Sequence, residues 1–508
     1  MVDMSWRVPP AVFVALLTIG FVSGSAVILA PPEGMATYPE VIAGVGNDGA
    51  GGFIVVVPFN LTPNGTPVVS GAWVGEFYPN GSIKWGENVK GVPLHPSPRI
   101  LRATANGSIL LIGQSDEGNH TDIWVIKLGK DGRLRWSKDY LLNVSPGWIM
   151  TVDDAVQAGN QILIATHVDS FKGEKQVTVP VVLALDGNGK LLWAGKYRIP
   201  HGPGELYSTA IGTVRDGYCL ILHDERNWYY LRLDKEGNPV ETWKVTSSLK
   251  GFFIKSALSM GNTVYFLGGS SNGTVLGAIV GNSTIWAKLY TLIPEKTCTE
   301  KSENVTVLST STSSTEPAPA LTVSGNYLLF QPTVVEAFRL ACNDDLNTTY
   351  AVIKTDTMGI VVGSFVAVSN GMSWEKTTLP EFLSEPVGVS ANGNSFIAIW
   401  RKTTASGAVL HFRGFAILSN LQSKPEGPLI GAHDFRVNVM PVDVELTPGP
   451  VVTKGKLGVK VVDEPIKIWR AEKAPVKVVT VEDSHKESIC GPGVILLLPL
   501  LVALRRRG

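Results

Sequence analysis

A unit of strand, tight turn and strand recurs along most of this chain of 508 residues, and it constrains the fold more than any other feature. Seven segments begin with a Gly, Asn or Asp turn and continue into an apolar, β-rich run. These segments start at Gly51, Asn106, Gly159, Asp216, Gly261, Gly325 and Gly393. An apolar or alternating stretch precedes several of the turns, so each unit predicts a β-hairpin.

In the early repeats a second pair of strands follows, and its last strand carries a tryptophan. These residues are Trp85, Trp136, Trp193 and Trp243, with a fifth at Trp286, and they recur about every 50 residues. Four strands in each repeat of this length are typical of a β-propeller. We therefore predict an all-β propeller of seven blades, with eight blades as the alternative. The recurring Trp is expected to fill the space between adjacent blades, where its large side chain buries most area.

A glycine precedes the tryptophan by four residues in three of these repeats, at Gly81, Gly132 and Gly189. Over residues 35–435 the chain resembles the PQQ-like propeller repeats, and the match is best at Ala184, Asp186, Gly189 and Trp193. It departs from that family because the Asp-to-Gly spacing is one residue short. The resemblance implies the propeller fold. Many propellers with this repeat bind no cofactor, so none is predicted, with calcium or pyrroloquinoline quinone as the alternative.

The beginning of the chain predicts export. Residues 11–30 carry no charge and follow Arg7, and small residues interrupt the run at 23–26. This pattern is typical of a secretory signal that is cleaved, here near Ala26 or Ala30. An uncleaved anchor is the alternative, since about 20 apolar residues can cross a bilayer. We therefore predict that residues 1–30 are a signal peptide or an N-terminal anchor.

The end of the chain combines Cys490, Gly491 and Pro492 with an apolar run at 494–504 and arginines at 505–507. The apolar run is shorter than the roughly 20 residues that a spanning helix needs. The order of these parts resembles the CGP-CTERM sorting signal of surface proteins in hyperthermophilic archaea. The resemblance implies export, processing near Cys490 and lipid attachment to its thiol. It also implies that the membrane holds the protein by its C-terminal tail, on the extracellular face of the cell.

Between the two ends we predict three further parts. Residues 31–436 form the propeller, and a polar insertion at 307–320 projects from its sixth repeat. Residues 437–467 predict further short strands, which close the ring, form an eighth blade or make a small separate β unit. Residues 468–489 become charged and predict a short stalk before the sorting segment, residues 490–508.

An exported chain can carry glycans and disulfides. Sequons of the N-x-Ser/Thr type predict glycosylation, although chance matches account for some in a chain rich in Asn, Ser and Thr. They occur at Asn60, Asn64, Asn80, Asn106, Asn119, Asn272, Asn282, Asn304 and Asn347, with a weaker one at Asn143. Cys298 and Cys342 flank the insertion and are expected to form a disulfide. Cys219 lies in an apolar run and is expected to be a buried free thiol.

The sequence holds few signs of catalysis. It lacks the HExxH, GxSxG and GxxxxGK[ST] motifs, and its eight histidines are scattered, so no metal site is predicted. Asp131, Asp186 and Asp234 recur where Asp favours a tight turn by bonding its own backbone. The acidic pairs Asp153–Asp154 and Asp344–Asp345 are interpreted as solvated loops. Acid–base chemistry or calcium binding is the alternative for each pair.

One aromatic cluster lies beside a cation, and its members are Arg226, Trp228, Tyr229 and Tyr230. Packing between blades is the favoured interpretation, and stacking on a sugar ring is the alternative. Lys plus Arg and Asp plus Glu are 44 each, so the net charge is zero and no nucleic-acid partner is expected.

Propellers present loops on a rigid scaffold, and such loops commonly carry binding. We therefore predict an exported, surface-anchored recognition module for a glycan, a peptide or an envelope partner. A structural envelope protein without a small ligand is one alternative. An extracellular enzyme, either a hydrolase or a quinoprotein-like oxidoreductase, is the other, and the missing motifs favour binding over catalysis.

Overall fold

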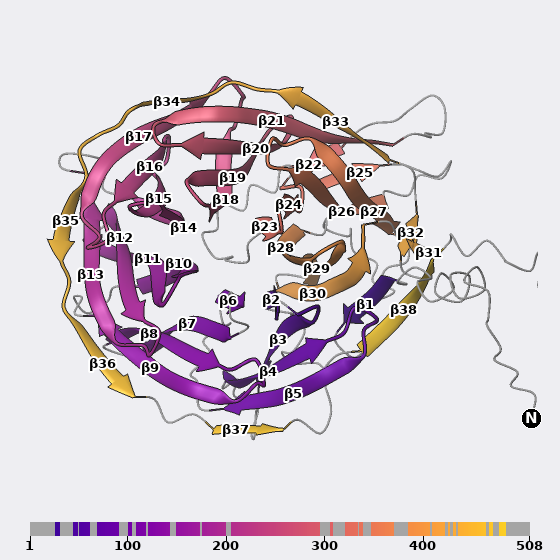
Figure 1. Ribbon diagram of the computed structural model, residues 1–508, viewed down its shortest axis with the longest axis horizontal. Helices are drawn as coiled ribbons and strands as arrows, with labels where there is room; N and C mark the ends of the chain where they lie inside the picture. The colour runs from indigo at the N-terminus through magenta and orange to yellow at the C-terminus, as the bar shows by residue number, and fades with distance from the viewer. Residues whose placement is uncertain are drawn as a thin grey trace, which may run out of the picture.

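The computed structural model describes residues 26–483 with gaps, the largest of which are 31–43, 61–68, 91–99, 295–304, 308–320, 339–346 and 370–384. Within this part of the chain every regular element is a β-strand. The strands form seven sheets around a central axis, and each sheet is one blade (Figure 1). The predicted all-β propeller with seven blades is therefore confirmed.

Five blades consist of four consecutive antiparallel strands, ordered from the axis outward (Figure 1). Blade 1 holds β2 (Gly44–Asn47), β3 (Phe53–Asn60), β4 (Val69–Phe77) and β5 (Ile83–Lys90). Blade 2 holds β6 (Ile100–Ala103), β7 (Ile109–Glu117), β8 (His120–Leu128) and β9 (Leu134–Leu142). Blade 3 holds β10 (Ile149–Ala158), β11 (Gln161–Lys172), β12 (Lys175–Asp186) and β13 (Leu191–Arg198). Blade 4 holds β14 (Tyr207–Val214), β15 (Gly217–His223), β16 (Trp228–Leu233) and β17 (Pro239–Ser247). Blade 5 holds β18 (Phe253–Met260), β19 (Thr263–Ser270), β20 (Gly273–Val280) and β21 (Ser283–Pro294).

Blade 6 holds β23 (Leu321–Ser324), β24 (Tyr327–Phe330), β26 (Asn347–Asp356) and β27 (Val361–Ser369). Two additional strands, β22 (Val305–Val307) and β25 (Val335–Phe338), extend its sheet through β26. Blade 7 takes β28 (Glu385–Asn392), β29 (Ser395–Ser406) and β30 (Val409–Asn420) from late in the chain. Its fourth strand is β1 (Ala26–Ala30), so the first described residues close the ring.

Strand β1 overlaps the predicted signal peptide or anchor, residues 1–30. It pairs with β30 in the register Val27↔Leu418, and its first four side chains are at most 1% exposed. Cleavage near Ala30 would remove this strand from blade 7, whereas cleavage at Ala26 would keep it. The structure therefore favours Ala26 among the two predicted positions. Residues 1–25 lie outside the described part of the chain, so cleavage itself stays a prediction.

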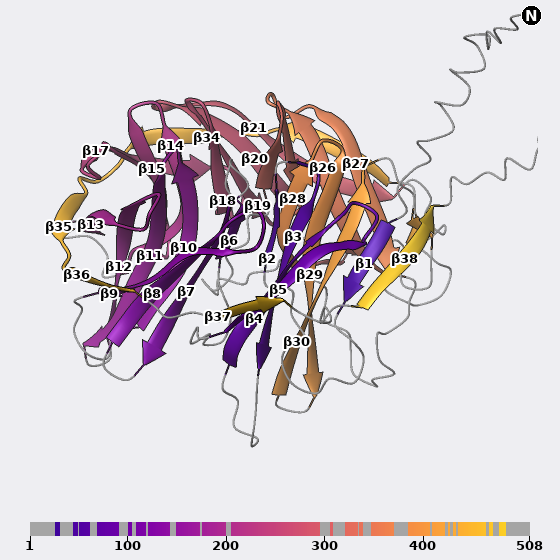
Figure 2. The same ribbon diagram turned by 60° about the horizontal axis from the view of Figure 1, so that its bottom comes forward.

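After blade 7 the chain reverses and circles the outside of the ring (Figures 1 and 2). Its strands are β31 (Pro425–Glu426), β32 (Ile430–Ala432), β33 (Phe435–Pro441), β34 (Val444–Pro448), β35 (Thr453–Lys456), β36 (Val459–Asp463), β37 (Lys467–Arg470) and β38 (Lys477–Asp483). We call residues 425–483 the belt. From β32 to β38 it adds one outer strand to blades 6, 5, 4, 3, 2, 1 and 7 in turn. Strand β31 pairs with β38, so the belt meets itself.

The belt bears on two expectations. Residues 437–467 do contain short strands, but these pair one by one with the outer strands of existing blades and form neither an eighth blade nor a separate unit. The stalk expected at 468–489 contains most of β37 and all of β38, which pair with β5 and β1. An outermost strand needs backbone partners but buries little side chain, so it tolerates a charged sequence. Residues 484–508, including Cys490, lie outside the described part of the chain.

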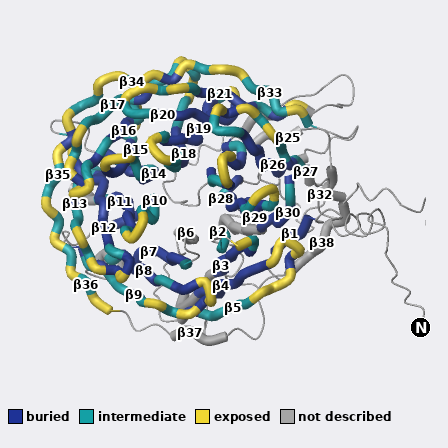
Figure 3. The backbone as a smooth tube through the Cα atoms, viewed as in Figure 1, coloured by how far each residue is buried: buried dark blue, intermediate teal, exposed yellow. Residues whose placement is uncertain are grey.

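The core lies between blades, where neighbouring sheets press their apolar faces together (Figure 3). Strand β15 is an example, because its residues from Gly217 to Leu222 are all buried and contribute to the cores on both sides of blade 4. Cys219 in this strand is a buried free cysteine, as predicted, and burial raises the pKa of its thiol to about 12. The predicted disulfide partners, Cys298 and Cys342, lie outside the described residues.

Tryptophans join neighbouring blades at a recurring turn. The Trp136 Nε1 in blade 2 donates to the Gly187 carbonyl of blade 3 over 3.0 Å, and Tyr140 OH donates to the Gly189 carbonyl over 2.6 Å. A Cβ on Gly189, whose φ is +75°, would lie 2.9 Å from the Trp136 ring. The same Trp and Tyr pair recurs at Trp193 with Tyr197 and at Trp286 with Tyr290. We call this arrangement the Trp–Tyr clamp.

The other two predicted blade-packing tryptophans depart from the clamp. Trp85 lies against Gly132 of blade 2, but its Nε1 donates to Glu76 of its own blade. Trp243 packs against the core between blades 4 and 5, and its Nε1 has no partner among the described residues. The facing turn of blade 5, between β20 and β21, holds only Gly281 and Asn282 and is shorter than the turn at 187–190 that Trp136 contacts in blade 3.

Candidate functional site

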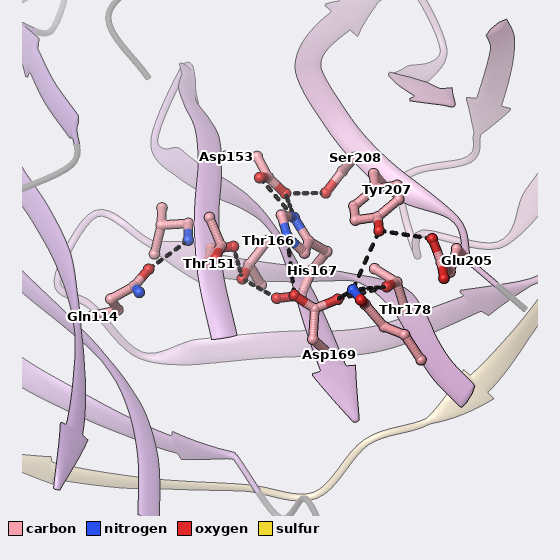
Figure 4. Close-up of polar contacts among 12 residues, drawn as sticks. Gln114, Thr151, Asp153, Thr166, His167, Asp169, Thr178, Glu205, Tyr207 and Ser208 are labelled. Carbon is pink, nitrogen blue, oxygen red and sulfur yellow. Dashed lines mark hydrogen bonds and ion pairs between the residues drawn. The ribbon is translucent and has the colours of Figure 1, made fainter. Parts of the chain in front are cut away.

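The richest polar cluster in the described part of the chain lies between blades 3 and 4, where the chain passes from β13 to β14 (Figure 4). Strands β10 to β12 supply its blade 3 side chains, and β14 to β16, together with Glu205 just before β14, supply those of blade 4. The connection is pinned in place, because the Leu206 amide donates to the Thr178 carbonyl over 3.1 Å. The cluster therefore sits on the face that carries the β11–β12 hairpin and the links between blades. We call it the rim site.

A bulge in β10 aims two successive carboxylates at blade 4. The register with β11 shifts between Val152 and Asp154, so Asp153 and Asp154 do not alternate across the sheet. Asp153 meets the side chain of Ser208, and Asp154 accepts a hydrogen bond from the Ile211 amide over 2.9 Å. The pair predicted to lie in a solvated loop is thus buried in the innermost strand. Asp154 ties two blades together, and Asp153 belongs to the rim site.

His167 lies fully buried at the base of the rim site. Its Nδ1 lies 2.8 and 2.9 Å from the two Asp153 oxygens, and its Nε2 lies 3.8 Å from the nearer Asp169 oxygen. Because a carboxylate only accepts, the Nδ1 atom carries the proton. The Ser208 hydroxyl also donates to Asp153 rather than to His167. This order does not activate a serine nucleophile, which requires the hydroxyl to donate to the imidazole.

Four half-buried polar side chains form the upper layer of the site. Gln176 donates to Asp169 over 3.2 Å and to the Tyr207 hydroxyl over 3.3 Å. Tyr207 in turn donates to Glu205 over 3.1 Å. Thr178, buried below them, donates to Asp169 over 2.5 Å. Two carboxylates, an amide and a hydroxyl are therefore held in fixed positions at the protein surface.

An aromatic row borders these groups on blade 4. Tyr207 stacks on His223 at 5.1 Å with an interplanar angle of 17°, and His223 lies 4.6 Å from Trp228. The three residues are direct cross-strand partners in β14, β15 and β16. The His167 ring meets Tyr207 edge-on at 5.2 Å. The row therefore connects the buried histidine with the half-exposed Trp228.

The turn after β15 presents a cation next to the row. Asp224 accepts hydrogen bonds from the amides of Arg226 and Asn227, both over 2.8 Å, and from Tyr229 OH over 2.7 Å. Burial alone would raise the pKa of Asp224, but these hydrogen bonds outweigh it and lower the pKa. The ionised carboxylate thereby fixes the turn, and Arg226 points from it as an exposed residue.

The surroundings set the charge of two ring groups. Burial lowers the pKa of His223 below its ordinary value of 6.5, and the nearby His167 lowers it further. Burial also raises the pKa of Tyr207, so its phenol keeps its proton. Both groups are thus neutral hydrogen-bonding partners at neutral pH. Among the described residues no group of three or more His, Cys, Asp or Glu side chains is placed to hold a metal ion.

The sequence predicts only part of the rim site. Trp228 was singled out, whereas Tyr229 and Tyr230 are buried in the core, as blade packing predicts. His167, Tyr207 and His223 were missed. A signal existed for one pair, because a tight turn at 224–227 places His223 opposite Trp228. The stacking of Tyr207 on His223 depends on a bulge between Ser208 and Ala210, and the sequence does not predict that bulge.

The remaining predicted positions lie elsewhere. Asp186 and Asp234 accept amide hydrogen bonds within their own turns, as expected, and Asp131 does the same. Asn80, Asn272 and Asn282 are exposed in turns, which suits the predicted glycosylation. Asn60 and Asn347 lie at strand ends whose side chains are not described. Outside the described residues lie Asn64, Asn106, Asn119, Asn143, Asn304 and the pair Asp344–Asp345. None of the described residues belongs to an apolar helix of membrane-spanning length.

Comparison with known proteins adds no family. No family model matches the sequence, and no curated protein matches it. Among solved structures, the chain is similar to the polysaccharide lyase Uly1, with a TM-score of 0.32 and 8% identity over 62% of this chain and 77% of that one. It is also similar to acylaminoacyl peptidase from Pyrococcus horikoshii, with a TM-score of 0.28 and 8% identity over 72% of this chain. The match spans 58% of the peptidase. Likeness at this level carries no argument about the site.

Proposed function

We propose that this propeller is a cell-surface recognition module and that the rim site binds a glycan. The observation that carries the proposal is the fixed set of Asp169, Gln176, Glu205 and Tyr207 beside the aromatic row. Sugar hydroxyls both donate and accept hydrogen bonds, so they need carboxylates and amides together. The half-exposed Trp228 adds an apolar surface that a sugar ring can contact.

The exposed surroundings of the site favour a neutral polyhydroxyl ligand over an anionic one. Asp169 and Glu205 are carboxylates, and they would repel a ligand carboxylate unless Arg226 paired with it. Rigid support comes from below, where the Thr178 hydroxyl donates to Asp169 on its buried side. A site whose side chains are already held loses less conformational entropy on binding. The proposed mechanism is therefore recognition by a preformed surface and involves no bond making or breaking.

The surface location belongs to the proposal as well. It is supported by the apolar run at 11–30 and by the order of parts at 490–508. A C-terminal anchor would follow the last belt strand, β38, which lies on blade 7 next to β1. Labelling with a radioactive lipid precursor tests it, and a Cys490→Ser chain is expected to lose the label. A label that survives this substitution would contradict the anchor.

The binding proposal is tested on an array of neutral and acidic oligosaccharides together with a panel of peptides, using the purified full chain. We expect binding to neutral oligosaccharides. Glu205→Gln loses a hydrogen bond to a charged group and Trp228→Ala loses the apolar surface under the sugar ring, so each should weaken binding by at least about tenfold. Glu445→Gln, an exposed carboxylate on the belt, is the matched control and should bind normally.

Three results would redirect the proposal. Binding to peptides alone would make the site a peptide groove. Binding that survives both rim substitutions would place the site elsewhere. A chain that binds nothing on either panel would instead be a structural envelope protein. Addition of calcium or pyrroloquinoline quinone to the same assay tests the cofactor alternative, and the proposal expects neither to be needed.

A further inference from the structure

A cavity opens over the inner strands of blades 6, 7 and 1. It has a volume of about 560 Å³ and is formed by the β23–β24 turn of blade 6, the β28–β29 turn of blade 7 and the end of β2 in blade 1. In every blade the turn between the two innermost strands lies at the end opposite the second hairpin, because successive strands are antiparallel. The cavity and the rim site therefore lie on opposite faces, and the cavity takes no part in the glycan proposal.

The cavity holds one buried cation. Lys354 on β26 is 8% exposed, its Nζ donates to the Asn394 side chain over 2.8 Å, and it lies 4.2 Å from the centre of the Tyr327 ring. No carboxylate of the described residues lies within ion-pairing distance of it, and none of the residues that line the cavity is acidic. Burial alone lowers the pKa of Lys354. A charge that is removed from water without a counter-ion is costly, so the site gains from an anion.

A second donor points to the same conclusion. The Asn392 side chain lines the cavity, and its Nδ2 is buried without a hydrogen-bond partner among the described residues. Such an unsatisfied donor costs free energy unless something in the cavity accepts from it. Asn47 closes the blade 1 side, where its Nδ2 donates to Ser390 over 3.0 Å and to the Ala391 carbonyl over 3.1 Å. The cavity thus offers a cation and one unsatisfied amide donor, and no acidic residue lines it.

We infer that this cavity binds a small carboxylate ligand, with the carboxylate accepting from Lys354 and Asn392. The planar Tyr327 ring, 40% exposed, offers an apolar wall for the rest of the ligand. Cavities that hold small molecules measure about 300 to 1,000 Å³, so this one accommodates a single acidic sugar or a short peptide end. Both sources present the same group, a carboxylate on a small polar body.

The test measures binding of simple probes to the full chain by isothermal titration calorimetry at neutral pH. Glucuronate and N-acetyl-alanyl-alanine carry the carboxylate, and methyl glucoside and N-acetyl-alanyl-alanine amide are their uncharged counterparts. We expect at least one acid to bind and its uncharged counterpart not to bind. Whichever acid binds identifies the source. Failure of both acids to bind at about 10 mM, a concentration far above ordinary ligand dissociation constants, would overturn the inference.

Three substitutions locate the binding. Lys354→Met keeps the length of the side chain without its charge, and Asn392→Asp replaces the donor by a carboxylate, so both should weaken binding by at least about tenfold. Asn392→Ala is a milder second variant if Lys354→Met fails to fold. Lys454→Met is the matched control, because Lys454 also lies over an aromatic ring, at 4.6 Å from Trp193, but on the belt.

Two outcomes separate this inference from the glycan proposal. Glu205→Gln and Trp228→Ala alter only the rim site, so acid binding should persist in them. Acid binding that disappears in the rim variants and survives Lys354→Met would assign the ligand to the rim and overturn the inference. Loss of acid binding in Lys454→Met would point to general electrostatic attraction and would overturn it as well.

Discussion

Single turn glycines set how closely adjacent blades approach each other. Gly189 and Gly159 both have positive φ, +75° and +59°, so an alanine at either position adopts a left-handed conformation that costs about 1–2 kcal/mol. Only Gly189 faces another blade, because a Cβ there would lie 2.9 Å from the Trp136 ring, while nothing lies within 4 Å at Gly159. The two positions therefore separate backbone strain from the packing of one blade on the next.

We predict that Gly189→Ala lowers the free energy of unfolding by at least about 1 kcal/mol more than Gly159→Ala does, the usual cost of overpacking a tight contact. Guanidinium unfolding of the two variants measures the difference. Equal losses would show that the indole moves aside freely and that the Trp–Tyr clamp does not fix the spacing of blades 2 and 3.

The buried His223 makes stability depend on pH. Its pKa in the folded chain lies below its unfolded value of 6.5, so between those two values the unfolded chain binds more protons. Stability therefore falls as the pH decreases below 6.5 and is fully present above it. We expect His223→Gln to flatten this part of the profile, measured as the unfolding midpoint between pH 5 and 8. Parallel profiles for the two chains would refute the assignment.

At the scale of elements, the sequence predicts the strands within each repeat, but it does not predict which distant segments pair with them. Turn glycines and alternating runs are local, so the hairpins and the tryptophan positions could be predicted. The tyrosine of the clamp also lies at a fixed spacing, four residues after Trp136, Trp193 and Trp286, and was open to detection. Strand β1 could not be predicted, because five apolar residues resemble the end of a signal peptide until their partner Leu418 is known.

Strand β1 permits a direct test at this scale. A chain that starts at residue 31 lacks the fourth strand of blade 7 and leaves Ile417 and Leu418, both 0% exposed, without their cover. Removing three large buried side chains at roughly 1.5–3 kcal/mol each should cost several kcal/mol of stability. A chain that starts at Ala26 keeps β1 and should be as stable as the full chain. If both chains unfold at the same guanidinium concentration, β1 does not close the ring.

The pairing of the belt strands could not be predicted from local sequence either. The charged stretch 468–489 resembles a stalk in sequence, yet it supplies most of β37 and all of β38. The belt strands from β32 to β38 form because each one pairs with the outer strand of a blade, and no local sequence pattern indicates that pairing. The rim site is similar, because its residues come from two blades and meet only when the ring forms.

On the scale of the whole molecule, the belt protects the outer edges of the blades one at a time. A chain that ends at Asp463 keeps β32 to β36 and loses β37 and β38, which cover β5 and β1. We predict that amide hydrogen exchange then speeds up in β5 and β1, while β13 and β17 keep their protection. Uniformly faster exchange would instead mean that the belt stabilises the ring only as a closed whole.

The pairing of β1 with β30 also determines when the fold can be completed. Val27 is made early, and its partner Leu418 is among the last residues of the blades to be made. Contacts so distant in sequence carry a large loop-closure cost and form late. Until then blade 7 is incomplete and β1 remains an unpaired edge that can associate with other chains. A ribosome must therefore nearly finish this protein before the ring can close, and a chain exported as it is made would close only on the far side of the membrane.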